Sequence, residues 1–119
     1  MLHPGDIVEV DLGEPMGSEA GLRRPAVVVT AGAVLRGGPN VVQVVPLTRT
    51  VRASGTEVIL EPDPENRLVE RSAAQCQHVR SVATRRILTC DGNSGPVALS
   101  AIRETLALLL DVEVVLSRL

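Results

Sequence analysis

The sequence predicts a mainly β domain of the α+β class, with about five to seven short strands and one C-terminal α-helix. Runs of Val, Ile and Leu recur along most of the chain, and groups of Gly, Pro and Asp separate these runs. Only the last part of the chain has apolar residues at helical spacing. The simplest arrangement is a small barrel, formed by one domain that covers residues 1–119.

Five segments have the composition of strands. Residues 7–12 alternate, with apolar residues on one face and Glu9 and Asp11 on the other. Residues 25–30 form a continuous run, which is typical of a strand buried on both faces. The remaining predicted strands cover residues 41–47, 56–60 and 72–82, the last of these as one strand or two.

The segments between these strands contain residues that favour turns. We expect an exposed, acidic loop at residues 13–24 and a second Gly-rich connection at residues 31–40. Residues 62–64 form a predicted turn, and residues 84–88 a short helical turn.

One clear helix is expected after Gly95 and Pro96. Ser100 is its expected N-cap. Apolar residues then recur at helical spacing, at Ile102, Leu106, Leu109 and Leu110. Further apolar residues, at Leu108, Val112 and Leu116, widen this stripe. We therefore expect one side of the helix to pack on the sheet and the other side on a second copy of the chain. Such a shared core would help a chain that has no Phe, Tyr or Trp.

The charges of the chain are segregated. The net charge is −2, and all 12 basic residues are Arg. The first 22 residues contain five acidic residues and no Arg, whereas residues 23–90 contain ten Arg and five acidic residues. The middle of the chain therefore suits an anionic partner, although scattered, solvated arginines would give the same composition.

Several classes of enzyme are excluded by missing motifs. The sequence has no nucleophile elbow, no zinc-protease motif and no P-loop, and because it has two histidines, one of them at position 3, we expect no His-Asp-Ser set. Cys76 and Cys90 do not form a disulfide framework or a zinc site, so we expect reduced thiols and no metal or other cofactor. We expect no signal peptide and no membrane span, and hence a cytoplasmic protein.

Arg24 and Thr48 are the strongest candidates for residues that act on a bound phosphate. Arg24 precedes Pro25, which holds the backbone extended and fixes the direction of the side chain at the start of a buried strand. Thr48 follows the next core strand, where its hydroxyl could donate to a phosphate oxygen. A solvated Arg and a turn-capping Thr would give the same pattern. Glu19 and His78 are equally open, either as solvated residues or as ligand contacts.

Several segments together resemble the MazF/PemK toxin family. The first motif of the resemblance lies at residues 5–8, 11–12, 17–19 and 23–29. Val45-Pro46-Leu47-Thr48 resembles the second motif, and residues 78–82 with residues 85–87 resemble the third. The helix that begins at Leu99-Ser100 is similar to the family's terminal pattern. The motifs occur in the right order and cover nearly the whole chain.

This resemblance implies an SH3-like barrel of the CcdB/PemK kind, and a homodimer. It implies a sequence-specific, ribosome-independent endoribonuclease toxin of a type II toxin–antitoxin system, which inhibits translation and growth. Such enzymes cut single-stranded RNA without a metal and leave a 2′,3′-cyclic phosphate and a 5′-hydroxyl. A cognate MazE-like antitoxin neutralises them by occupying the RNA groove with a flexible tail.

Carried over by position, the resemblance also implies the roles of single residues. Arg24 and Thr48 match the two catalytic positions. The expected RNA-contacting residues are Ser18, Glu19, Arg23, Arg49, His78 and Arg80. The general base stays open between Glu19 and a water, because an arginine keeps its proton.

Two positions depart from the family pattern. Glu9 stands where the family often has an aromatic residue, and His78 where it often has glutamine. The chain therefore has no aromatic ring on which an RNA base could stack. Two alternatives remain at this stage: a CcdB-like toxin that binds a protein such as gyrase and cuts nothing, and a degenerate module that only binds antitoxin or RNA.

Overall fold

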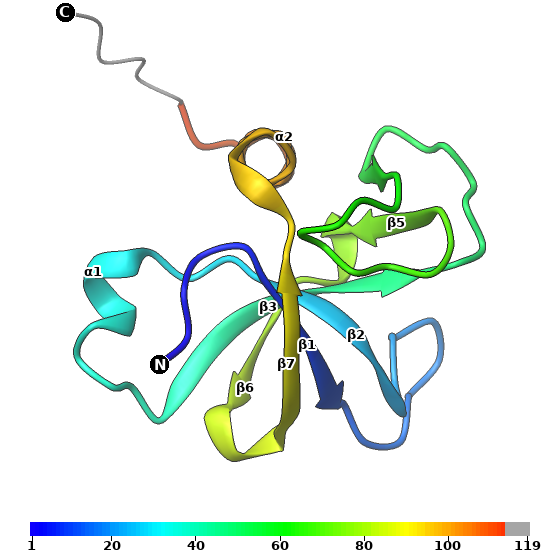
Figure 1. The fold of residues 1–119 in the computed structure, drawn as a ribbon. Helices are drawn as coiled ribbons and strands as arrows, with labels where there is room; N and C mark the ends of the chain where they lie inside the picture. The colour runs from blue at the N-terminus through cyan, green and yellow to red at the C-terminus, as the bar shows by residue number, and fades with distance from the viewer. Residues whose placement is uncertain (114–119) are drawn as a thin grey trace, which may run out of the picture.

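The computed structural model describes residues 1–113, which form an antiparallel sheet of seven strands with a helix at one end (Figure 1). Its strands are β1 (Asp6–Asp11), β2 (Arg23–Val28), β3 (Val41–Thr48), β4 (Glu57–Leu60), β5 (Ser72–Gln75), β6 (Arg80–Ala83) and β7 (Ile87–Asn93). Hydrogen bonding runs in the order β4-β5-β3-β2-β1-β7, and β6 pairs with the first half of β3 on the edge opposite to β2, the same edge that β5 occupies further along. The mainly β class and the predicted number of strands are confirmed. Within the described residues the two ends of this path do not pair, so the sheet is not a closed barrel.

Strand β2 lies at the centre of the sheet, and its second half, residues 26–28, is buried on both faces, as the apolar run in the sequence predicts. It pairs with β1 through Ile7–Val27 and with β3 through Val28–Val44. Because successive side chains of a strand point to opposite faces, Val27 and Val28 enter different apolar clusters. The sheet therefore has a core on each side.

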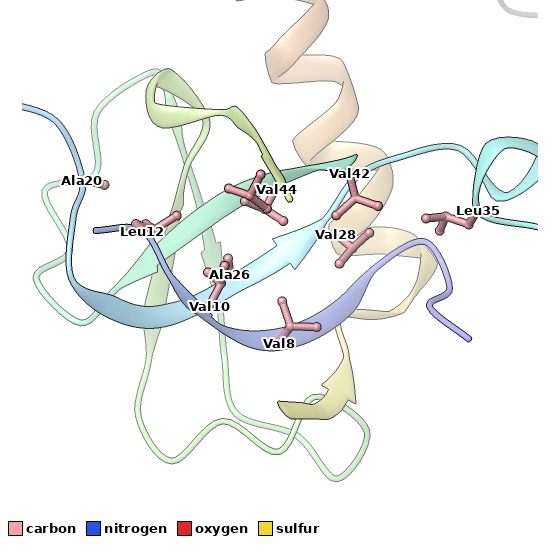
Figure 2. Close-up of a cluster of buried hydrophobic side chains, with 10 residues drawn as sticks. Val8, Val10, Leu12, Ala20, Ala26, Val28, Leu35, Val42 and Val44 are labelled. Atoms are coloured by element: carbon pink, nitrogen blue, oxygen red, sulfur yellow. The ribbon is translucent and has the colours of Figure 1, made fainter. Parts of the chain in front are cut away.

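The first cluster packs one face of β1, β2 and β3 against the start of the chain (Figure 2). Its buried residues are Val8, Val10, Leu12, Ala20, Ala26, Val28, Leu35, Val42, Val44 and Val82. Leu35 comes from a short helix, α1 (Gly32–Leu35), inside the segment that we expected to be an irregular connection. Burial of Leu35 stabilises the ordered conformation of this segment, because α1 covers one end of the cluster.

The second cluster joins the other face of the sheet to the helix α2 (Gly95–Leu109). Ile102 of α2 is fully buried there, beside Leu60 of β4 and Cys76 of the 3₁₀ turn η1 (Cys76–His78). Figure 1 shows α2 at the β4–β5 end of the sheet, where it contacts β4 and η1.

The start of α2 corrects one prediction. Ser100 is an exposed residue inside the helix, and the residue that precedes the helix is Ser94. Pro96 lies in the first turn, where proline is tolerated because the first N–H groups of a helix have no partner within it. Leu108 is 81% exposed and Val97 is 85% exposed, so α2 has apolar residues on its outer side as well. Leu116, which we placed in the same stripe, lies outside the described residues.

Two further segments differ from or refine the sequence prediction. Strand β7 was not predicted; five of its seven residues are Thr89, Cys90, Asp91, Gly92 and Asn93, which lack the apolar alternation of a strand. Residues 72–82 form two strands separated by η1, and the predicted helical turn is the 3₁₀ turn η2 (Thr84–Arg86). The polar composition of β7 fits its place at an edge of the sheet.

The two cysteines are free and lie in different surroundings. Burial raises the pKa of the Cys76 thiol to about 11, so this thiol stays protonated at neutral pH. Cys90 lies on β7 and is exposed. The part of its thiol that is shielded from water, and then the negative charge of nearby Asp6, raise the pKa of Cys90 above its usual value. Among residues 1–113, no helix has the length and apolar character needed to cross a bilayer.

Candidate active site

Arg24 lies at the start of β2, opposite Val10 of β1, with its side chain half-buried. Two hydrogen bonds hold the guanidinium. Its Nε donates to the carbonyl oxygen of Gly21 at 3.2 Å, and its Nη1 donates to Oε1 of Gln75 at 3.4 Å. A guanidinium has five N–H donors in one plane, so these two bonds fix its orientation and leave Nη2 to donate to an anion.

Thr48 is the last residue of β3, and its backbone lies opposite Ala73 of β5. Its side chain is half-buried, and its Oγ1 accepts a hydrogen bond from the backbone N–H of Thr50 at 3.1 Å. The hydroxyl keeps its own proton to donate. Accepting from the backbone also limits rotation of the hydroxyl, so its direction is partly fixed.

Arg24 and Thr48 come from separate strands, and both line two neighbouring surface cavities. The first cavity has a volume of about 500 Å³ and includes Ser18, Glu19 and His78 in its wall. The second has a volume of about 470 Å³ and includes Arg23 and Arg49. The structure thus brings seven of the eight predicted site residues to two cavities that share the predicted catalytic pair.

Arg80 is the exception, because it lines neither cavity. Its Nη1 donates to the carbonyl oxygen of Leu12 at 3.2 Å, where the chain leaves β1. Leu12 N–H in turn donates to Leu22 at 2.9 Å, and this closes the base of the β1–β2 loop (residues 12–22). Arg80 therefore contacts the base of the loop whose residues Ser18 and Glu19 form one wall of the first cavity.

Cations outnumber anions in both cavities. Arg24 and Arg52 face one acid, Glu19, in the first cavity. In the second, three arginines accompany Glu9 and Glu70, and Arg49 pairs with Glu70 at 3.8 Å on the exposed surface. Exposed pairs of this kind contribute little to stability, so Arg49 can exchange its partner for a ligand anion at small cost. The arrangement suits a chain of phosphates that crosses from one cavity to the other at Arg24.

Four polar wall residues of the first cavity were missed by sequence reasoning: Thr50, Arg52, Gln75 and Gln77. Gln75 had a usable signal, because it is a polar residue between Ala73, Ala74 and Cys76, all of them fully buried. Within the described residues no group of three or more His, Cys, Asp or Glu side chains is placed to hold a metal ion.

The β1–β2 loop reaches Arg24 through Gly21, and this contact gives a testable prediction. A methyl group at Gly21 would lie 2.6 Å from Cβ and 2.7 Å from the backbone N of Pro15, so the loop would have to move. Gly21→Ala is then expected to displace the carbonyl that holds Arg24 Nε, and to slow any reaction that depends on Arg24 by at least about tenfold. Single-turnover kinetics measure this loss. Gly55→Ala is the matched control, because a methyl group there meets nothing within 4 Å; equal rates for the two variants would contradict the prediction.

Comparison with known proteins places this chain among toxins. A family model described as PemK-like, MazF-like toxin of type II toxin–antitoxin systems matches residues 3–110. The chain is similar to Endoribonuclease MazF9 of Mycobacterium tuberculosis, with 35% identity over 117 residues that cover 94% of this chain and 98% of the relative. It is also similar to the crystal structure of MazF from Deinococcus radiodurans, with a TM-score of 0.75 and 27% identity over 92% of this chain and 96% of that one. A MazE-MazF structure from the same organism gives a TM-score of 0.70 and 27% identity, with the same coverage of both chains.

Proposed function

The chain belongs to the PemK-like, MazF-like family of toxins from type II toxin–antitoxin systems, and from this premise we propose that it is a sequence-specific endoribonuclease. Its substrate is single-stranded RNA, and its activity stops translation and growth. The reaction uses the 2′-hydroxyl of the RNA itself as nucleophile, without a metal or other cofactor.

The observation that supports this proposal most strongly is the junction of the two cavities at Arg24 and Thr48. A scissile phosphate at this junction would have one neighbouring nucleotide in each cavity. The guanidinium of Arg24, held by Gly21 and Gln75, would present Nη2 to a non-bridging oxygen. The Thr48 hydroxyl would donate to the same phosphate.

The chemistry needs little more than alignment and charge stabilisation. The 2′-hydroxyl gives its proton to a base, either Glu19 or a water, and the 2′-oxygen attacks the adjacent phosphorus. The bond to the 5′-oxygen breaks and that oxygen takes up a proton, which leaves a 2′,3′-cyclic phosphate and a 5′-hydroxyl. The phosphorane passed on the way carries extra negative charge on its oxygens. Donors that are already fixed in place lower the barrier, because they need no reorganisation as the charge develops. Arg24 and Thr48 are assigned to these oxygens.

Five of the six remaining predicted residues are assigned to RNA contact. Ser18, Glu19 and His78 line the first cavity, where hydroxyl, carboxylate and imidazole groups can hydrogen-bond to base edges. Arg23 and Arg49 line the second cavity and can contact phosphates or stack on a base. Arg80 is assigned an indirect role, since its hydrogen bond to Leu12 supports the loop that carries Ser18 and Glu19.

The family also points to protein partners. We assign a cognate MazE-like antitoxin to this chain, since a solved structure with 27% identity to it is that of MazE-MazF. We also assign a homodimer to it, as the family resemblance implies. We further assign the whole chain, residues 1–119, to one domain, and the protein to the cytoplasm, without membrane contact.

A cleavage assay tests the proposed function. Purified protein is incubated with a long RNA in EDTA, and the new 5′ ends are mapped and tested for a 5′-hydroxyl. We expect cuts at a short recurring sequence whose rate does not depend on EDTA. Intact RNA would contradict the nuclease and favour a toxin that acts only by binding, as CcdB does.

Thr48→Val tests the second catalytic assignment in the same assay. Valine keeps the β-branched shape but removes the hydroxyl, and a lost hydrogen bond to a charged group costs about 1.5–3 kcal/mol, or about 10–10²-fold in rate. Thr89→Val is the matched control, since Thr89 is exposed on β7 and lies outside both cavities. If the two variants cut equally fast, Thr48 has no role in the reaction.

A further inference from the structure

We propose that Gln75 is a positioning residue for Arg24, so that one strand, β5, sets the geometry of both catalytic groups. The inference rests on the proposed nuclease function and extends it, because Gln75 was not among the residues that the sequence or the family resemblance pointed to. It acts through Arg24 and need not touch the reacting atoms.

The first support for this role is the burial of Gln75. It is the last residue of β5 and only 6% exposed, and its backbone pairs with Glu57 of β4. Its neighbours along the chain, Ala73, Ala74 and Cys76, are small and fully buried, whereas Gln75 also lines the first cavity. Burying part of an amide costs hydration, and a hydrogen bond offsets that loss. Among the described residues, the side chain of Gln75 has one hydrogen-bond partner, and that partner is Arg24.

The second support is the contact itself. Oε1 of Gln75 accepts from Nη1 of Arg24 at 3.4 Å, and the carbonyl oxygen of Gly21 accepts from Nε at 3.2 Å. One hydrogen bond alone would let the planar group rotate about the contact. Two acceptors at two different nitrogens restrict both the position and the tilt of the plane, and they leave Nη2 to donate to a ligand.

The third support is that β5 also holds Thr48. Ala73 lies opposite Thr48 and Ala74 opposite Leu47, so β5 is hydrogen-bonded to the end of β3 at this point. Gln75 lies two residues beyond Ala73, and alternate residues of a strand share a face. The same short strand therefore sets the height of the Thr48 hydroxyl and supplies the acceptor for Arg24. A change in β5 would alter the distance between the two groups that act on the phosphate.

The arrangement makes a specific kinetic prediction. Gln75→Leu is expected to leave the RNA dissociation constant nearly unchanged, because Arg24 keeps its charge, and to lower the single-turnover rate by about tenfold, because the guanidinium is no longer oriented. In an Arg24→Ala background, Gln75→Leu is expected to have no further effect. A merely structural residue would lower the rate in both backgrounds, and a residue that binds RNA would raise the dissociation constant.

Gln43→Leu is the matched control. Gln43 is also a partly buried strand glutamine with side-chain hydrogen bonds, in this case to Thr30 and Ser81, and it lies outside both cavities. It is expected to cut RNA at the rate of the unmodified chain. Melting curves show whether each variant folds, and rates are compared between variants that are folded at the assay temperature.

The outcomes separate this inference from the proposed function. If the unmodified chain cuts RNA and Gln75→Leu cuts equally fast, or if the losses of Gln75→Leu and Arg24→Ala add, the positioning role is wrong. If the unmodified chain does not cut RNA, the proposed function fails instead. The orientation is then judged by the side-chain ¹⁵N relaxation of Arg24 Nε, which should show greater mobility in Gln75→Leu than in Gln43→Leu. Equal mobility would overturn the inference.

Discussion

Replacing Arg24 with alanine is expected to slow RNA cutting by about 10²–10³-fold, as removal of one fixed donor to a developing anion does in other enzymes. The change removes a side chain that lines both cavities, as Thr48 does, and that two hydrogen bonds hold in place. The dissociation constant for RNA should rise far less, because Arg23, Arg49 and Arg52 remain in the cavity walls. Single-turnover cleavage and equilibrium binding, measured on the same RNA, give the two values.

The control for this variant is Arg36→Ala, since Arg36 is exposed beside α1 and belongs to neither cavity. Both variants lose one positive charge, so any general effect of net charge on RNA binding is shared. Cutting by Arg24→Ala at the rate of Arg36→Ala would remove Arg24 from the reaction, even if the chain is a nuclease.

Ile102→Ala has the largest expected effect on stability and lowers the free energy of unfolding by about 2–5 kcal/mol. Ile102 is fully buried and is the side chain through which α2 enters the second cluster, beside Leu60 and Cys76. Its truncation leaves a cavity between the helix and the sheet that the surrounding strands cannot fill by moving. Urea unfolding, followed by far-ultraviolet circular dichroism, measures the loss.

Ser100→Ala, on the same helix, is the control and also checks the corrected start of α2. A serine that caps the helix would cost about 1 kcal/mol when replaced by alanine. Because Ser100 is exposed inside α2, we expect a change within about 0.5 kcal/mol. A loss for Ser100→Ala as large as that for Ile102→Ala would mean that the assigned packing of α2 is wrong.

The central strands could be predicted from the sequence because burial dictates their composition. β1, β2 and β3 are rich in valine, and their apolar residues follow the two faces of the sheet. β7 could not be predicted, because it lies at an edge and its polar residues are held by pairing with β1 rather than by burial. The start of α2 was missed for a different reason. Ser94 precedes the helix but makes no side-chain cap hydrogen bond. The sequence rule for a capping serine therefore does not apply at the real start of the helix, and it selected Ser100 instead.

The candidate site was predictable where it depends on local chemistry and on family motifs. Arg24 and Thr48 stand at strand ends, and Ser18, Glu19 and His78 belong to the segments that resemble the family. Gln75 could not be connected to Arg24, because 51 residues separate them and the contact depends on the order β5-β3-β2 in the sheet. The hydrogen bond between Arg80 and Leu12 joins residues 68 positions apart, and it could not be predicted from the sequence for the same reason.

The burial of β2 between two clusters has a consequence for how the protein opens. Val27 belongs to one cluster and Val28 to the other. Neither cluster can therefore unfold while the amide groups of these two residues stay protected from exchange with solvent. The amide protons of β2 should then exchange with solvent only in the globally unfolded chain, whereas the β1–β2 loop and the exposed end of α2 exchange through small local openings. The strand that carries Arg24 is thus among the last parts of the fold to unfold. The loop beside it opens more easily, and because the carbonyl of Gly21 in that loop accepts from Arg24 Nε, a rearrangement of the loop around RNA or an antitoxin also changes the orientation of the guanidinium.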